Sequence, residues 1–159
     1  SWGYSANPLR FKSKVFLDSW SNVLYIIPGL IAYSVFSAPL PNFQVIVGLA
    51  AWTAGMHLYS AIPDISADAR AGVRTTAVVL GTRRSLLLTA FYWLSCALIL
   101  ISEFPAQHWL VVLSVYPIIP IAHLLFPSID LQKMYWYFPW LNTILGFATF
   151  WILAIQRQL

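Results

Sequence analysis

Five long apolar stretches limit what this chain can fold into. They cover residues 19–37, 43–60, 85–102, 108–126 and 138–155, and each is close to the ~20 residues that cross a bilayer core as an α-helix. Only 9% of the residues are charged, whereas a soluble domain has about 25%. The stretches also lack the polar faces that the helices of a soluble bundle present to water. The sequence therefore predicts an all-α, multispanning membrane bundle of about five spans, formed by residues 1–159 as a single domain.

Basic residues lie almost wholly in alternate connections between these stretches. Those connections carry Arg10, Lys12, Lys14, Arg70, Arg74, Arg83, Arg84 and Lys133. The connections 38–42 and 103–107 contain no lysine or arginine, and only Arg157 falls on their side. Because cytoplasmic loops are enriched in lysine and arginine, the connection 61–84 is predicted to face the cytoplasm of a bacterial or archaeal cell. The net charge of +4 does not indicate a nucleic acid partner, because the chain lacks an exposed face for a basic stripe.

The connection 61–84 is too long and too rich in structural signals to be a slack loop. Gly72 permits a break in the backbone, and Thr75 or Thr76 can cap a short helix that Gly81 then ends. We therefore expect short helices here, held over the end of the apolar bundle.

Two carboxylates in this connection stand out. Asp64 and Asp68 are four residues apart, so on a helical turn both point the same way, and their like charges repel. A divalent cation would remove that repulsion, and Mg²⁺ typically takes one or two carboxylates together with phosphate oxygens. The spacing therefore indicates a candidate magnesium site.

Cations follow the carboxylate pair and also precede the first apolar stretch. We assign Arg70 and Arg74 to an anion site from their charge and proximity, with Lys12 on a connection facing the same compartment. A metal flanked by cations is the arrangement that a diphosphate requires. The alternative is that Asp64 pairs with Arg70, and Asp68 with Arg74, as ordinary surface ion pairs, which are common and weak.

Two longer strings carry a resemblance to a known family. Residues 59–81, YSAIPDISADARAGVRTTAVVLG, closely resemble the second aspartate-rich motif of UbiA-type membrane prenyltransferases, D-x-x-x-D-x-x-x-G, with its following T-x-A-x-x-L-G-like segment. Residues 2–12, WGYSANPLRFK, resemble the Y-S-x-x-P-x-R-x-K stretch of an earlier cytoplasmic loop in that family. The resemblance covers essentially the whole chain, which would hold the last five of the family's nine helices.

The resemblance implies a Mg²⁺-dependent transferase that moves a polyprenyl group from an allylic diphosphate to a hydrophobic acceptor in the lipid bilayer. Carried onto this sequence, the motifs imply that Asp64 and Asp68 hold Mg²⁺ against the diphosphate. They also imply that Lys12 and Arg10 contact its oxygens, with Tyr4 from the same stretch beside them. Metal and cations together would stabilise the leaving diphosphate electrostatically.

The chain departs from the family pattern in one respect. A complete member has another aspartate-rich motif, N-D-x-x-D-like, earlier in the chain. The only other acids here are Asp18, Glu103 and Asp130, which form no such cluster. We therefore expect this chain to be the C-terminal part of a longer protein, to lack the second metal site, and to be inactive alone.

The acceptor is indicated by the resemblance only. Residues 17–29 and 55–64 look most like members that act on carotenoids, the lycopene elongase type. Within the enzyme class, the alternatives are prenylation of a quinone precursor or of a tetrapyrrole acid. From a different class, the alternative is a cation-coupled membrane transporter, whose site would lie at the bilayer midplane. Asp64 and Asp68 lie in a charged connection instead, which favours the diphosphate interpretation.

Three further residues are candidates for lining a cavity below the acidic connection. His57 lies seven residues before Asp64, on the same side of a continuous helix, although a histidine satisfied inside the bundle is the alternative. Asn22 is four residues after Asp18, whose carboxylate we expect chiefly at a helix N-terminus. Tyr59 presents an aromatic face suited to a prenyl chain or a carbocation, as do Tyr25, Tyr33 and Trp52. Packing and anchoring at the membrane interface are the alternatives for each of these four residues.

Overall fold

A computed structural model describes residues 2–6, 8–37 and 40–156 of the chain, so Arg157 lies outside it. Every regular element in these ranges is a helix, which confirms the all-α fold. In chain order the elements are α1 (Trp2–Ser5), η1 (Phe11–Ser13), α2 (Leu17–Trp20), η2 (Ser21–Ile26), α3 (Ile27–Ser37), α4 (Phe43–Ala61), α5 (Ile65–Arg70), α6 (Thr76–Glu103), η3 (His108–Ser114), α7 (Val115–Leu125) and α8 (Leu131–Gln156), where η denotes a 3₁₀ helix.

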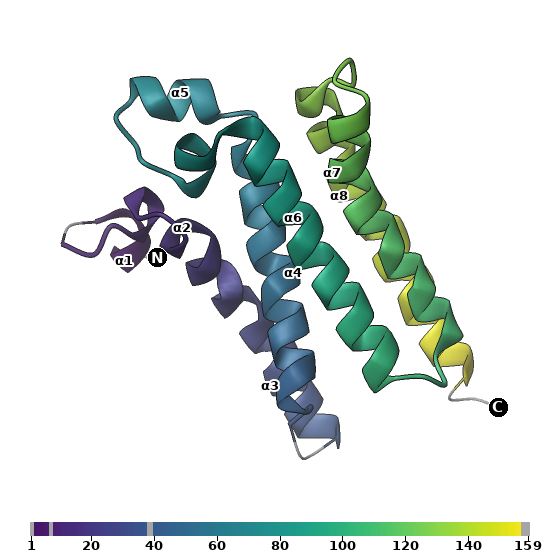
Figure 1. Cartoon of the computed structure of the whole chain (residues 1–159). Helices are drawn as coiled ribbons and strands as arrows, with labels where there is room; N and C mark the ends of the chain where they lie inside the picture. Colours follow the sequence, from purple (N-terminus) through teal and green to yellow (C-terminus); the bar gives the residue numbers. More distant parts are fainter. Residues whose placement is uncertain (1, 7, 38–39, 157–159) are drawn as a thin grey trace.

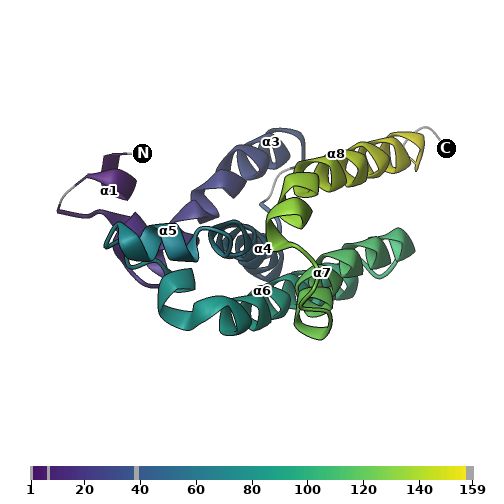
Figure 2. The ribbon, with the colours of Figure 1, turned by 90° about the horizontal axis from the view of Figure 1, so that it is seen from above.

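Helices α4 and α6 pack side by side at the centre of the bundle, with α3 on one side and the α7–α8 pair on the other (Figure 1). The short elements α1, α2 and α5 gather at one end, beside the connection between α4 and α6 (Figures 1 and 2). The bundle thus has one end that is rich in short polar segments.

Small residues let the two central helices approach closely. A Cβ built on Gly55 of α4 would lie 2.8 Å from Nε1 of Trp93 in α6, closer than side chains pack. The same indole donates a hydrogen bond to the carbonyl of Trp52 at 3.1 Å, and its ring stacks on Phe138 of α8 with centroids 5.4 Å apart. Close helix approach at small residues is typical of membrane bundles.

Three segments within the described residues are long and apolar enough to cross a membrane, fewer than the five predicted. They are Thr76–Glu103, His108–Leu125 and Leu131–Gln156. Helix α4 has 19 residues, about 28 Å at about 1.5 Å per residue, but polar residues such as His57 lower its hydropathy. The first stretch divides into α2, η2 and an α3 of only 11 residues, and at the start of η2 Asn22 donates a hydrogen bond to the Asp18 carbonyl at 2.6 Å.

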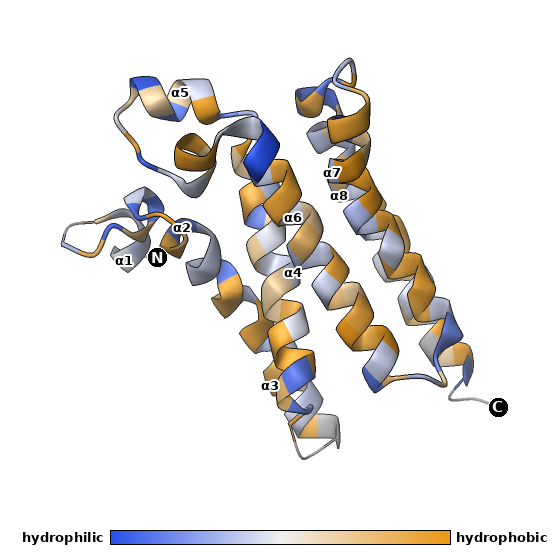
Figure 3. Ribbon diagram, in the orientation of Figure 1, coloured by the Kyte–Doolittle hydropathy of each residue, from blue (hydrophilic) through white to orange (hydrophobic). Residues whose placement is uncertain are grey.

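Apolar residues predominate along the long helices (Figure 3), and many of them are exposed. On α8, Phe147, Phe150 and Trp151 are half or more exposed. An outer surface of this kind meets lipid rather than water, as expected for a membrane bundle.

The internal breaks predicted for the connection 61–84 are confirmed. Gly72 has a φ of 68°, a left-handed conformation that glycine adopts without steric cost. The Thr75 hydroxyl accepts a hydrogen bond from the Val78 amide at 3.2 Å and so caps α6. Gly81 interrupts α6 with φ 73° and ψ 168°. The connection is a structured element held over the end of α4 and α6.

Candidate functional site

The two aspartates sit at the start and the middle of α5. Asp64 occupies the N-cap position without using its side chain as a cap, and the Asp68 amide donates to the Asp64 carbonyl at 2.9 Å. This turn places both carboxylates on one side of α5. Asp64 is exposed and Asp68 is half-buried, so the pair is accessible to solvent and Asp68 is the more enclosed of the two.

The surroundings of Asp68 disfavour its charged form. Burial, then the negative charges of Asp64 and Asp18, raise the pKa of the Asp68 carboxyl, while Lys12 and the Thr75 hydroxyl lower it. The cation that acts on Asp68 is therefore Lys12, from a segment far away in the sequence, and not Arg74 as the surface ion-pair interpretation would require. A second cation at this pair would be favoured, since it would offset the remaining repulsion.

The segment around Lys12 lies at the same end of the bundle as α5 (Figure 1). Lys12 belongs to η1. Arg10 is the residue before η1 and adopts a left-handed conformation with φ 37°. Both side chains are half-buried, whereas Arg70 and Arg74 are exposed. The structure thus places the half-buried Lys12 at the same end of the bundle as the acidic pair and leaves the two arginines of the 61–84 connection at the surface.

Tyr4 connects this segment to α4. Its hydroxyl lies 3.3 Å from Nε2 of His57, and the two rings meet edge to face with centroids 6.2 Å apart. Burial, and next the charge of Asp18, raise the pKa of the Tyr4 hydroxyl. That hydroxyl is therefore neutral at physiological pH and available as a hydrogen-bond donor.

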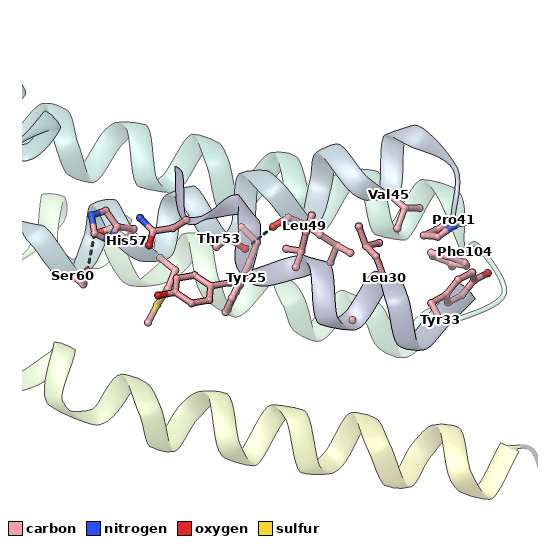
Figure 4. A pocket seen from close by; sticks show the side chains of 15 residues that line it. Tyr25, Leu30, Tyr33, Pro41, Val45, Leu49, Thr53, His57, Ser60 and Phe104 are labelled. Atoms are coloured by element: carbon pink, nitrogen blue, oxygen red, sulfur yellow. Dashed lines mark hydrogen bonds between the residues drawn. The ribbon is translucent and has the colours of Figure 1, made fainter. Parts of the chain in front are cut away.

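Below this contact lies a cavity of about 820 Å³ between η2, α3 and α4. One end is polar, with His57 and Ser60 from α4 and Asn22 from η2, and the Ser60 hydroxyl bonds the His57 carbonyl (Figure 4). The other end is apolar, where Tyr33 and Phe104 lie (Figure 4). The cavity therefore runs along η2, α3 and α4 from the polar end to an apolar, partly exposed end at Tyr33 and Phe104.

Tyr59 does not line this cavity. It is fully buried in the core, and its hydroxyl lies 3.0 Å from Nε2 of His123 in α7. Asn22 and His57 do line the cavity. Of the four aromatic residues expected to face a prenyl chain, Tyr25, Tyr33 and Trp52 line the cavity.

Comparison with known proteins places this arrangement in a family. The model of the UbiA prenyltransferase family matches residues 1–135. The chain belongs to this family. No solved structure matches it.

Similar UbiA-family proteins come from haloarchaea. The chain is 41% identical over 158 residues to a lycopene elongase/hydratase of Haloarcula japonica, covering 98% of this chain and 52% of that protein. It is 40% identical over 145 residues to a lycopene elongase/hydratase of Haloferax volcanii, covering 90% of this chain and 46% of the relative. The chain thus spans about half the length of the curated relatives it matches.

A magnesium ion of the kind this family implies fits the residues present as a half-site. Within the described part of the chain, no group of three or more His, Cys, Asp or Glu side chains converges as a metal cage. Mg²⁺ does not need one, because it keeps several waters and completes its shell with phosphate oxygens. Asp64 and Asp68, with their mutual repulsion, could supply the one or two carboxylates of such a site.

Proposed function

We propose that the whole protein containing this chain transfers a prenyl group from an allylic diphosphate to a carotenoid such as lycopene. The observation that supports this proposal is the contact between Tyr4 and His57. His57 lines the cavity, and the charge of Asp68 acts on the Tyr4 hydroxyl. The names of the haloarchaeal relatives support the carotenoid acceptor. The basic connections support a cytoplasmic position for the site.

In this proposal, Asp64 and Asp68 would hold Mg²⁺, and a bound metal would supply positive charge against the leaving diphosphate. Lys12 and Arg10 bind the diphosphate oxygens, Arg70 and Arg74 add positive charge at the rim, and Tyr4 donates a hydrogen bond. The bond between the allylic carbon and its oxygen breaks, the diphosphate leaves with the electron pair, and an alkene of the acceptor forms the new carbon–carbon bond. The carbocation left on the acceptor is then neutralised by loss of a proton to water or to the released diphosphate. The chain's own residues bind and orient the substrate rather than reacting covalently.

The cavity suits the prenyl chain of the donor. It begins beside the Tyr4 and His57 contact and ends among apolar side chains, so a diphosphate at the acidic pair would direct its hydrocarbon tail inward. Tyr25 and Trp52 line the walls, and aromatic faces attract a cation by about 0.5–2 kcal/mol. A cation-coupled transporter is less well supported, because the carboxylates lie at one end of the bundle (Figure 1) and not at its middle.

Membranes containing the whole protein, supplied with a labelled allylic diphosphate and lycopene, are expected to form an elongated carotenoid. Chelation with EDTA should abolish the product and added Mg²⁺ should restore it, since the acidic pair binds through the metal. Liquid chromatography with mass spectrometry measures the product. An aromatic quinone precursor or a tetrapyrrole acid prenylated in place of lycopene would contradict the acceptor. Diphosphate release that persists fully in EDTA would contradict the metal.

Residues 1–159 alone are expected to release diphosphate at least about 10²-fold more slowly than the whole protein, because they carry one acidic motif and not two. Malachite-green detection after pyrophosphatase treatment measures the release from detergent-purified samples. Far-ultraviolet circular dichroism serves as the control that the chain is helical. Release at a rate near that of the whole protein would show that one motif suffices.

A further inference from the structure

Asp18 in α2 is a buried carboxylate outside the proposed substrate contacts. It is fully buried, yet it accepts hydrogen bonds from the Thr76 amide at 2.6 Å and the Thr76 hydroxyl at 2.5 Å. The Ser19 amide donates a third bond at 2.8 Å. A buried charge is tolerated only with such partners. Because these donors occupy its oxygens, Asp18 is not placed to act as a further metal ligand.

Thr76 is the first residue of α6, so the Asp18 carboxylate lies at the positive end of that helix. Thr76 also contacts the backbone two residues before Asp18, at Phe16. Its hydroxyl accepts a hydrogen bond from the Phe16 amide at 2.6 Å. Phe16 has φ 66° and ψ −37°, a conformation that residues other than glycine rarely adopt. Such a backbone persists where surrounding contacts determine it, and here those contacts are the hydrogen bonds of Thr76 and Asp18.

These bonds join two segments 58 residues apart. Lys12 lies six residues before Asp18, and Asp68 lies eight residues before Thr76. The clamp formed by Phe16, Asp18 and Thr76 therefore links the segment that carries the diphosphate-binding cation to the one that carries the acidic pair.

We infer that Asp18 is a positioning residue, whose clamp to Thr76 sets the Lys12 segment over α5 so that cation and carboxylates face the same diphosphate. The expected change in KM rests on the proposed function. The expected movement of the Lys12 segment does not, because it follows from the hydrogen bonds of the clamp. Without the clamp, Phe16 can relax and the segment carrying Lys12 can move away from Asp68. The affinity for the diphosphate should then fall more than the rate of the chemical step.

The test uses the whole protein with Asp18→Asn and Thr76→Val. The asparagine side chain would replace one acceptor oxygen by an NH₂ group facing the donors of Thr76 and Ser19, and valine removes the hydroxyl that bonds the Phe16 amide. We expect both variants to raise the KM for the allylic diphosphate about 10-fold, with kcat changed less than about 3-fold, because uniform binding is lost. Thr76→Ser keeps the hydroxyl and the amide, and should retain the wild-type KM.

Tyr92→Phe is the matched control, because Tyr92 accepts the other hydrogen bond between α2 and α6, from Nε1 of Trp20 at 3.0 Å. It should lower the thermal unfolding temperature without changing KM. Variants at Asp18 and Thr76 that lose thermal stability but keep the wild-type KM would overturn the inference, because Asp18 would then be only structural.

Hydrogen exchange separates a failure of this inference from a failure of the proposed function. In the Asp18→Asn and Thr76→Val proteins, the amides of residues 10–14 and 65–72 should exchange faster than in wild type, whether or not any prenyl transfer is detected. If the wild-type protein had no transferase activity, the proposed function would be contradicted. The hydrogen-exchange result would still test the clamp. Unchanged exchange in both segments would overturn the clamp as a positioning element.

Discussion

Asp68→Asn in the whole protein is expected to lower the rate of prenyl transfer by about 10²- to 10³-fold, the range seen when a single group that stabilises developing charge is removed. Asp64→Asn should act in the same direction. Each variant removes one carboxylate of the proposed Mg²⁺ site, while the isosteric amide preserves the α5 turn in which the Asp68 amide bonds the Asp64 carbonyl. Single-turnover assays with a labelled allylic diphosphate measure the change. Activity should recover in part at high Mg²⁺, because the remaining carboxylate still binds the metal.

Asp130→Asn is the matched control for this pair. Asp130 is an exposed carboxylate in the connection between α7 and α8, at the same end of the bundle (Figure 1). Its Oδ1 accepts a hydrogen bond from the Lys133 amide at 3.1 Å. Asparagine caps helices about as well as aspartate, so the exchange should keep this bond and leave transfer unchanged. Equal losses in the Asp68 and Asp130 variants would remove the acidic pair from the mechanism.

Gly29→Phe is expected to shorten the prenyl donor that the protein accepts. Gly29 lines the cavity, and a Cβ added there meets no atom within 4 Å, so a phenyl ring would occupy space now open to the tail. Overfilling an apolar site costs about 1–3 kcal/mol, so kcat/KM for the longest accepted donor should fall about 10- to 100-fold. A series of allylic diphosphates of increasing chain length measures this, and the shortest should be affected least.

Gly146→Phe provides the comparison for the cavity variant. Gly146 also lies within a long helix, α8, and its added Cβ likewise meets nothing within 4 Å, but it does not line the cavity. Both exchanges thus replace an unobstructed helical glycine by the same side chain. An identical response of the two variants across the donor series would show that the cavity does not hold the prenyl tail.

The helix breaks and the helix cap along the connection 61–84 could be predicted from its residues because the signals there are local. Gly72 and Gly81 adopt the positive φ values that their lack of a Cβ permits, and Thr75 caps the helix that follows it. Each of these features depends on a few neighbouring residues. The all-α membrane character follows equally directly from the length of the apolar stretches.

The number of segments able to span the membrane could not be predicted in the same way. Residues 19–37 form an apolar stretch in the sequence, but their first part is drawn into α2 and η2, where Asn22 bonds the Asp18 carbonyl. Hydropathy averages over a window and does not register such a bond. Within the described residues, three segments meet the length and hydropathy required, so the count of about five spans stays a prediction.

The sequence alone determined which residues are chemically capable: an acidic pair spaced by one helical turn, cations on both sides of it, and apolar helices to hold a lipid-like substrate. Tertiary structure decided which of them meet. It brings Lys12 rather than Arg74 to bear on Asp68, turns His57 to the cavity and Tyr59 to the core, and joins Asp18 to Thr76 across 58 residues. Contacts between residues so far apart in the sequence depend on how whole helices pack. They close long loops, and no pattern among neighbouring residues predicts them.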